Sequence, residues 1–285
     1  MSERIVITGA GGLVGRTLAA RASEAGHEVL ALRSADCDIT DPTALERVVT
    51  AGDVVVNCAA FTKVDDAERQ EEAAFAVNAT GAEHVAHACA RAGARLLHIS
   101  TDYVFDGRFD GAPRPYDIDD PTGPLSVYGR SKLSGEFAVL AAMPDAHVVR
   151  TAWIFSGGEG ADYVSTMAAN ARSGIAVEAV ADQVSSPTYV GDLVDALLEL
   201  AGNAAIREPV LHAANDGPGS RYEQARLTYG LVGADPELVR PVGTDRHPRP
   251  APRPPYSVLS SQKSSEAGLT PLRGWREALA VALGG

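Results

Sequence analysis

Short apolar runs alternate with longer amphipathic segments over the first two-thirds of the chain. The runs are rich in β-branched residues, as in strands buried on both faces, and the longer segments have the apolar spacing of helices. The predicted strands are residues 4–8, 27–32, 53–58, 95–100 and 147–151, and the predicted helices are residues 16–25, 42–51, 67–92 (one or two helices) and 131–142. This alternation predicts an α/β fold with a doubly wound parallel sheet, Rossmann-like, and right-handed crossovers.

The pattern weakens after Trp153, where the apolar segments become shorter. Residues 241–255 contain six prolines, which excludes a helix or a central strand there. This segment is either a solvated linker or an ordered loop over the active site, and the last predicted helix covers residues 274–283. The predicted domains are a dinucleotide-binding domain of residues 1–152 plus about 179–212, and a smaller C-terminal substrate-binding lobe of about 153–178 plus 213–285.

Composition narrows the possible classes of protein. A chain of 285 residues that is 45% hydrophobic and 22% charged can bury a sizeable core. The 37 acidic against 25 basic residues argue against a general nucleic-acid binder, because neutralising phosphates needs a basic face. We expect no signal peptide and no membrane span, since no apolar run approaches the ~18 residues that a span needs.

Cysteine and histidine spacing predicts neither disulfides nor a metal site. Cys37, Cys58 and Cys89 lack CxxC spacing and are expected to be reduced thiols in a cytoplasmic protein. The seven histidines are scattered without the spacing of metal ligands.

A glycine-rich turn, TGAGGLVG, follows the first predicted strand and places Gly9, Gly12 and Gly15 in GxxGxxG spacing. Glycine allows positive φ and lets the backbone approach a pyrophosphate closely. The N-terminus of the next helix offers free N–H groups and a partial positive charge. Since the turn joins a strand to a helix, it predicts a dinucleotide-binding site.

The end of the second predicted strand bears on the choice of cofactor. An acidic residue there would bind the ribose 2′-hydroxyl of NAD, whereas an arginine would accommodate the 2′-phosphate of NADP. The chain reads ALRS, with Arg33 and no acid, so NADPH is favoured over NADH. Arg33 could instead be a solvated residue at a strand end. Asp38 and Ile39 begin a later loop that could lie along the adenine edge.

Tyr128 and Lys132 are four residues apart and share one face of a predicted helix. An ammonium ~4 Å from the phenol, at an effective dielectric of ~20, contributes about 4 kcal/mol, or roughly three pKa units. We therefore expect the pKa of Tyr128 to be lowered towards neutrality, where general acid catalysis is effective. Thr101 ends the preceding strand, where ligands bind in this fold, and can polarise a carbonyl that Tyr128 protonates as hydride arrives.

Longer segments resemble a known family over nearly the whole chain. They are TGAGGLVG, CDITDP, VNCAAFTKVDDAE, AVNATGAEHVA, HISTDYVFDG, PLSVYGRSKLSGE, VVRTAWIF, DQVSSPTY and PLRGWREAL. In these segments the chain resembles the dTDP-4-dehydrorhamnose reductases of the extended short-chain dehydrogenase/reductase superfamily. The resemblance implies reduction of the 4-keto group of a dTDP-linked 6-deoxyhexulose, giving dTDP-L-rhamnose. The expected binding partner is then a nucleotide-sugar substrate, and we expect neither a nucleic acid nor a membrane as a partner. The resemblance leaves open whether the protein is a homodimer.

The resemblance also implies roles for individual residues. Tyr128 would be the catalytic acid, and Lys132 would bind the nicotinamide ribose and tune Tyr128. With the positions identified above, the expected cofactor-binding residues are Gly9, Gly12, Leu13, Val14, Gly15, Arg33, Asp38, Ile39, Ala59, Ala60, Phe61, Tyr128 and Lys132. The expected catalytic residues are Tyr128, Lys132 and Thr101, and the expected substrate-binding residues are Thr101, Asp102, Tyr128 and Trp153.

Four further residues are candidates for the site. Asn78 is either a polar group of a helix or part of a proton relay, and Lys63 either contacts a substrate phosphate or is solvated. Arg249 and Arg253 could clamp a pyrophosphate bidentately, although the resemblance of their segment to the family is loose.

Two other functions stay open. A nucleotide-sugar dehydratase or epimerase would use bound NAD, but dehydratases of this fold carry an acid directly after Thr-Asp, where this chain has Tyr103. A non-catalytic regulatory subunit, resembling the beta subunit of methionine adenosyltransferase, belongs to the same superfamily. The intact set of Tyr128, Lys132 and Thr101 argues against it.

Overall fold

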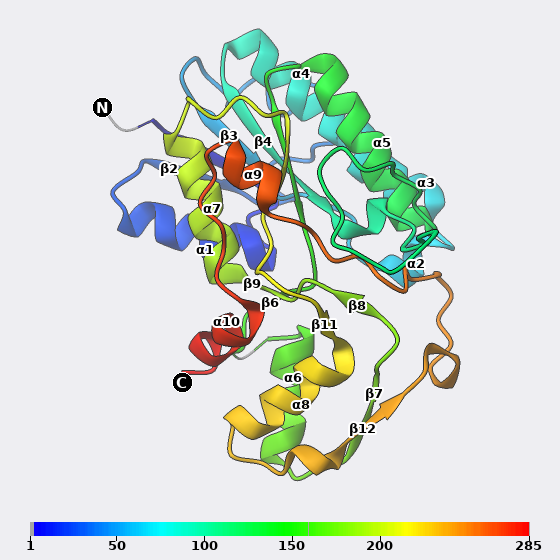
Figure 1. Ribbon diagram of the computed structural model, residues 1–285. Helices are drawn as coiled ribbons and strands as arrows, with labels where there is room; N and C mark the ends of the chain where they lie inside the picture. Colours follow the sequence, from blue (N-terminus) through cyan, green and yellow to red (C-terminus); the bar gives the residue numbers. More distant parts are fainter. Residues whose placement is uncertain (1–2, 159, 285) are drawn as a thin grey trace.

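The computed structural model describes residues 3–158 and 160–284, and its centre is a sheet of six strands (Figure 1). The strands are β1 (Ile5–Thr8), β2 (Val29–Leu32), β3 (Val54–Asn57), β4 (Arg95–Thr101), β5 (His147–Thr151) and β10 (Val210–His212). They lie in the order β10-β5-β4-β3-β1-β2, and all neighbouring strands are parallel. The predicted doubly wound, Rossmann-like fold is confirmed.

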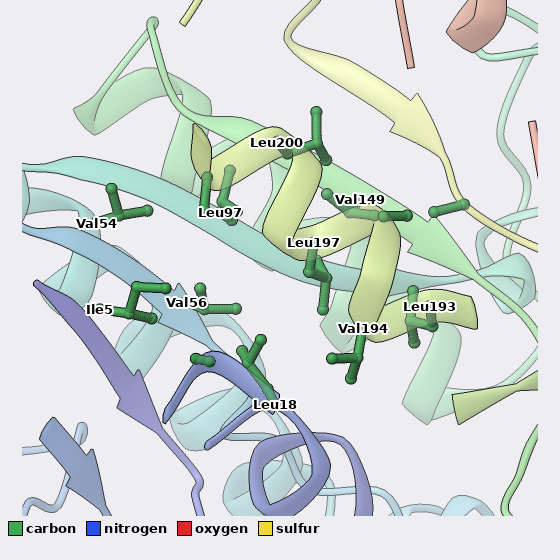
Figure 2. Close-up of a cluster of buried hydrophobic side chains, with 14 of the residues drawn as sticks. Ile5, Leu18, Val54, Val56, Leu97, Val149, Leu193, Val194, Leu197 and Leu200 are labelled. Carbon is green, nitrogen blue, oxygen red and sulfur yellow. The ribbon is translucent and has the colours of Figure 1, made fainter. Parts of the chain in front are cut away.

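Helices cover both faces of this sheet, which is why β1 and β3 are buried along their whole length (Figure 1). One face carries α1 (Leu13–Glu24) and α7 (Val190–Gly202), and the other carries α4 (Ala82–Ala92) and α5 (Val127–Ala142). Successive side chains of a strand point to opposite faces, so Ile5 and Ile7 enter the first core and Val6 the second. Figure 2 shows the first core, which includes Leu18 of α1 and Leu197 of α7.

The helix predicted over residues 42–51 is wrong, because the chain forms a series of turns there. The Asp41 carboxylate accepts hydrogen bonds from both the N–H and the hydroxyl of Thr43, each at 2.9 Å. A side chain that binds nearby backbone groups in this way competes with helical hydrogen bonds and favours turns. Leu45 and Val49 still reach the second core from these turns.

The segment predicted as one or two helices over residues 67–92 is divided into shorter elements. They are α2 (Val64–Ala67), α3 (Glu71–Phe75), a π-helical turn (Ala76–Gly81) and α4. The next helix, α5, begins four residues before its predicted start of 131, because the Ser126 hydroxyl accepts a hydrogen bond from the N–H of Gly129 at 3.1 Å. Tyr128 and Lys132 therefore both lie within α5.

The remaining elements form a second part beside the carboxyl ends of the central strands (Figure 1). Its paired strands are β6 (Ile154–Phe155) with β9 (Thr188–Tyr189), β7 (Val177–Val180) with β12 (Val239–Val242), and β8 (Val184–Ser185) with β11 (Gly219–Ser220). Its helices are α6 (Tyr163–Arg172), α8 (Arg221–Leu231) and α10 (Trp275–Ala282), while α9 (Gln262–Glu266) contacts β10. Short 3-10 helices cover Asp102–Val104, Pro236–Leu238 and Thr244–Arg246.

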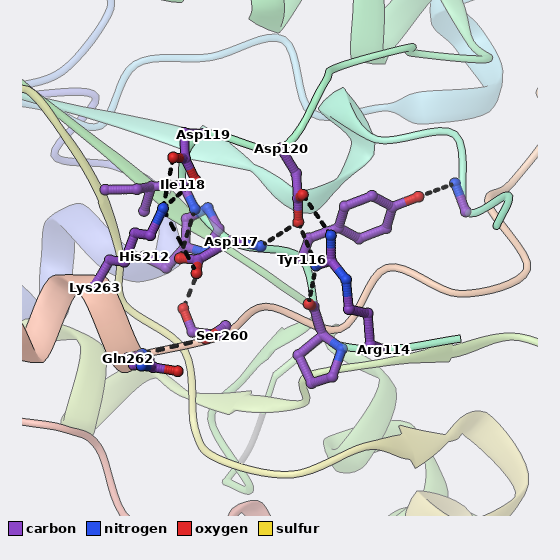
Figure 3. Close-up of polar contacts among 12 residues, drawn as sticks. Arg114, Tyr116, Asp117, Ile118, Asp119, Asp120, His212, Ser260, Gln262 and Lys263 are labelled. Atoms are coloured by element: carbon purple, nitrogen blue, oxygen red, sulfur yellow. Dashed lines mark hydrogen bonds and ion pairs between the residues drawn. The ribbon is translucent and has the colours of Figure 1, made fainter. Parts of the chain in front are cut away.

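A polar cluster joins the loop after β4 to the C-terminal segment (Figure 3). Lys263 of α9 donates to both carboxylate oxygens of Asp119 at 2.5 Å, and Arg114 holds Asp120 bidentately at 2.6 Å. The N–H of Tyr116 also donates to a backbone carbonyl of the C-terminal segment at 2.7 Å. These contacts fix the loop against the rest of the chain. Over residues 3–158 and 160–284, no helix combines the length and apolar character needed to cross a bilayer.

Candidate active site

A groove of about 840 Å³ runs along the carboxyl ends of β1, β2 and β3. Eleven of the expected cofactor-binding residues line it, namely Gly9, Gly12, Leu13, Val14, Gly15, Arg33, Asp38, Ile39, Ala59, Ala60 and Phe61. In parallel sheets of this type, ligands bind at the carboxyl ends of the strands. The groove thus lies where the fold places a nucleotide.

The glycine turn allows close packing at the base of this groove. Gly9 has φ 66°, and a Cβ there would lie 2.5 Å from the backbone nitrogen of Ala59. A Cβ on Gly15 would lie 2.6 Å from the Gly9 carbonyl oxygen. Gly12 is the N-cap of α1, so the helix directs its free N–H groups and partial positive charge into the groove. The shape and charge of this cradle fit the pyrophosphate of a dinucleotide.

The far end of the groove contains the residues that bear on cofactor choice. Arg33 is exposed, and no ion pair of its guanidinium occurs among the residues that the structure describes. The Asp38 carboxylate accepts hydrogen bonds from the N–H and hydroxyl of Thr40, at 2.9 and 2.8 Å, and so shapes its own loop. Ile39 is buried in the core while it lines the groove. The arginine is therefore the charged group there that is free to meet a ligand.

A second cavity, of about 350 Å³, adjoins the groove and shares Val14, Ala59 and Ala60 with it. Its walls bring together residues that are distant in the sequence. They are Thr101, Asp102, Tyr128, Lys132, Trp153 and Arg221, with neighbouring apolar and hydroxyl residues. All four expected substrate-binding residues thus line one cavity, next to the end of the nucleotide groove.

Burial sets the ionisation of the Tyr128/Lys132 pair. Burial raises the pKa of Tyr128 well above its ordinary value, and a hydrogen bond with Thr101 opposes this only in part. The expectation that Lys132 lowers the pKa of Tyr128 towards neutrality is wrong for the free protein. The Lys132 ammonium is itself buried, which lowers its pKa to about 8, and it donates to the carbonyl of Ile99 at 2.7 Å. Tyr128 is therefore a protonated phenol at neutral pH, the form that can donate a proton.

Asp102 is a buried carboxylate held by three hydroxyl groups. Ser257, Ser185 and Thr101 donate to it at 2.6, 2.8 and 3.1 Å. Burial raises the pKa of Asp102, while the hydrogen bonds from Ser257 and Ser185 lower it. The carboxylate joins the end of β4 to two segments of the second part, so it positions Thr101 as well as lining the cavity.

Trp153 and Arg221 also line this cavity. The guanidinium carbon of Arg221 lies 3.7 Å from the centre of the Trp153 ring and 4.7 Å from that of Tyr163. Trp153 has φ 41°, a strained value for a large side chain, which turns its ring towards the cavity. Sequence reasoning missed Arg221, because one arginine at the start of a helix is usually a surface residue.

The proline-rich segment is an ordered loop rather than a solvated linker. Arg253 forms a bidentate ion pair with Asp65 of α2, at 2.5 and 2.9 Å, and the N–H of Ala251 donates to the same carboxylate at 3.2 Å. Arg249 lies 3.7 Å from Asp65. Both arginines therefore already have a carboxylate partner in the free protein.

Asn78 and Lys63 lie outside the cavity walls. The Asn78 amide bonds the backbone N–H and carbonyl of Phe61 at 2.8 and 3.1 Å, and it donates to the Ser131 hydroxyl at 2.9 Å. It thus fixes the loop after β3 against α5. Lys63 is exposed, with its ammonium 3.9 Å from Asp66.

The fold and this site define a class. A parallel doubly wound sheet, a glycine turn that opens α1, and a Tyr-x-x-x-Lys helix beside the end of β4 are the features of the short-chain dehydrogenases/reductases. The chain belongs to the family described as RmlD substrate binding domain, whose model matches residues 3–284. This confirms the family resemblance found in the sequence.

Similar proteins agree with this assignment. The dTDP-4-dehydrorhamnose reductase of Mycolicibacterium smegmatis is 61% identical over 279 residues, which is 98% of this chain and 84% of that protein. The reductase of the same name from Mycobacterium tuberculosis H37Rv is 59% identical over 283 residues, 99% of this chain and 93% of that protein. The crystal structure of the Bacillus anthracis dTDP-4-dehydrorhamnose reductase in complex with NADP has a TM-score of 0.91 and 33% identity, covering 98% of both chains.

Proposed function

We propose that the protein reduces the 4-keto group of a dTDP-linked 6-deoxy-4-hexulose, converting dTDP-4-dehydrorhamnose to dTDP-L-rhamnose with a nicotinamide cofactor. The observation that carries this proposal is the small cavity holding Tyr128 and Thr101 at the end of the nucleotide groove. The mycobacterial relatives that bear the reductase name cover nearly the whole chain.

The glycine cradle and the groove residues would hold the dinucleotide. When bound, the reduced nicotinamide supplies a hydride to the carbonyl carbon of the sugar. Tyr128 transfers its phenolic proton to the carbonyl oxygen, so the ketone becomes an alcohol and the phenol becomes a phenolate. Thr101 turns its hydroxyl proton from Asp102 to the carbonyl oxygen and so polarises the carbonyl. Lys132 in its ammonium form stabilises the phenolate and would bind the ribose. Trp153 and Asp102 form the wall against which the sugar packs.

NADPH is the proposed cofactor in preference to NADH. The support is Arg33, which is exposed at the groove and free of an ion pair within the described residues. Its guanidinium can hold a phosphate bidentately, and β2 ends without an acid that would bind the free 2′-hydroxyl.

The two parts of the chain have different proposed binding roles. We propose that residues 1–152 plus about 179–212 bind the dinucleotide and that about 153–178 plus 213–285 bind the substrate. The pairing of β7 with β12, of β8 with β11 and of β9 with β6 favours moving the boundary at about 179 to just after β9, where α7 begins. A homodimer is also proposed, and light scattering tests it.

The experiment that tests the function is an NADPH-consumption assay on a panel of dTDP- and UDP-linked keto-sugars, with the product's stereochemistry read by NMR. We expect rapid consumption only with the dTDP-linked 4-keto-6-deoxyhexulose. Faster turnover of another sugar would assign a different 4-ketoreductase. No turnover with any of them, together with a stoichiometric partner enzyme in a pull-down, would favour the regulatory-subunit alternative.

A further inference from the structure

Four buried polar side chains form a connected series of polar contacts that crosses the central sheet and ends at Lys132. The Thr8 hydroxyl at the end of β1 donates to Asn57 Oδ1 at 2.7 Å, and Asn57 Nδ2 lies 3.0 Å from His98 Nδ1. His98 Nε2 in turn lies 3.4 Å from Lys132 Nζ. None of the four residues is more than 2% exposed. This series of contacts connects β1, the strand that leads into the glycine turn, with the lysine of the Tyr-x-x-x-Lys pair.

The hydrogen bonds of Asn57 fix its orientation. The N–H of Ala59 donates to Asn57 Oδ1 at 3.2 Å, and the Thr8 hydroxyl donates to the same oxygen. The atom that faces His98 is therefore the amide nitrogen, which can only donate. His98 Nδ1 must accept this hydrogen bond, so the neutral ring carries its proton on Nε2. Burial holds the pKa of His98 well below its usual value, which keeps the ring neutral.

At the other end, the Nε2–H of His98 meets the nitrogen of Lys132. An ammonium has three donors and no acceptor, so the contact at 3.4 Å would set one donor against another. A neutral amine has a lone pair that can accept this hydrogen bond. It can still donate to the carbonyl of Ile99, which lies 2.7 Å from Lys132 Nζ. The geometry therefore fits the amine better than the ammonium.

The groups around Lys132 do not reverse this preference. The carboxylate of Glu136, on the next turn of α5, raises the pKa of Lys132, but it is held by Arg150 of β5, with Nη2–Oε2 2.7 Å and Nε–Oε1 3.0 Å. Burial raises the pKa of the Cys58 thiol after β3 to about 12, so it is uncharged, and Tyr128 is a neutral phenol. Among the described residues, Lys132 forms no ion pair.

We propose that His98 is a positioning residue for Lys132: with its tautomer fixed by Asn57, it presents an N–H donor to the lysine and so makes the neutral amine accessible near neutral pH in the free protein. The catalytic meaning rests on the role of Lys132 proposed above. In its ammonium form Lys132 can return a proton to the Tyr128 phenolate after turnover, which regenerates the phenol and leaves the amine that accepts from His98. His98 itself touches neither substrate nor cofactor in this scheme.

The chain offers a direct test, because it contains only three lysines, Lys63, Lys132 and Lys263. In protein labelled with ¹³C-lysine, the Cε signal of each lysine reports its own titration, and Lys63→Arg and Lys263→Arg identify the third signal. We expect Lys132 to titrate near pH 8, well below the ordinary lysine value of about 10.4. His98→Gln should raise its pKa by about one unit, a tenfold change in the protonation equilibrium, because the glutamine carbonyl can turn to accept from the ammonium.

The matched control is His147→Gln, since His147 is also buried on a neighbouring strand but bonds the carbonyl of Glu208 at 2.9 Å. It should leave the titration of Lys132 unchanged. The proposal is overturned by an unchanged pKa of Lys132 in His98→Gln, by an equal shift in His147→Gln, or by wild-type Lys132 titrating at the ordinary lysine value of about 10.4.

A second measurement needs no variant. In ¹⁵N-histidine-labelled protein, long-range ¹H–¹⁵N correlations give the tautomer of each ring. We expect His98, assigned through the backbone, to be neutral with its proton on Nε2 from pH 5 to 9. A proton on Nδ1, or an imidazolium in this range, overturns the proposal. Both measurements are made without substrate, so their failure is separate from failure of the proposed reductase activity.

Discussion

The buried ion pair between Glu136 and Arg150 allows a quantitative test of how the site is supported. The two side chains are only 3% and 6% exposed, and three nitrogen–oxygen contacts of 2.7 to 3.2 Å join them. Glu136→Gln keeps the size of the side chain but removes its charge and sets an amide N–H against the guanidinium. Removing one partner of a buried pair typically costs about 3–5 kcal/mol, because the other charge stays buried and uncompensated. At roughly 2–4 °C per kcal/mol, the melting temperature should fall by about 6–20 °C.

Differential scanning calorimetry and urea unfolding measure this change. The matched control is Glu46→Gln, because Glu46 pairs with Arg91 at the surface, where the two side chains are 46% and 54% exposed. An exposed pair of this kind contributes less than about 1 kcal/mol. The reasoning would be refuted if Glu136→Gln were no less stable than Glu46→Gln. It also requires that the double variant Glu136→Leu/Arg150→Met, which leaves no buried charge, be more stable than Glu136→Gln.

Three further predictions concern the site itself. Tyr128→Phe should lower kcat by about 10²–10⁴-fold, the usual contribution of a general acid, while NADPH still binds in a fluorescence titration; a wild-type rate would exclude Tyr128 as the acid. Arg33→Asp should shift the ratio of kcat/KM for NADPH and NADH towards NADH, and an unchanged ratio would reject contact with the 2′-phosphate. Gly15→Ala should weaken NADPH binding, because the new Cβ would lie 2.6 Å from the Gly9 carbonyl oxygen, whereas Gly111→Ala, with no atom within 4 Å of the added Cβ, should not.

Most of the central sheet could be predicted from the sequence, because strands buried on both faces leave uninterrupted apolar runs. The structure confirms the five strands predicted over the first two-thirds of the chain. The sixth, β10, has three residues, too few to form a recognisable pattern. The false helix over residues 42–51 has an apolar spacing that does place Leu45 and Val49 in the core. Spacing alone does not reveal that Asp41 binds the backbone and replaces the helix with turns.

Some features of the candidate site could likewise be predicted from the sequence and others could not. Sequence motifs placed residues such as Tyr128 and Trp153, which the fold brings to one cavity. The ionisation of Tyr128 could not be predicted, because helical spacing gives the proximity of a charge but not the loss of water around both groups. Arg221 was missed for a similar reason, since its partners are aromatic rings from distant segments. The two interpretations of the proline-rich segment could be decided only by its contact with Asp65.

The hydroxyl groups around Asp102 have a mechanical consequence. Ser185 and Ser257 belong to segments of the second part, whereas Asp102 directly follows β4 of the central sheet. If the two parts moved apart, the Asp102 carboxylate would lose two of its three hydroxyl donors. Each buried polar group left unsatisfied costs about 1–3 kcal/mol. The width of the substrate cavity is therefore set before any ligand arrives. We therefore expect the protein to select its sugar with a cavity of fixed width, and not by closure of the two parts around the substrate.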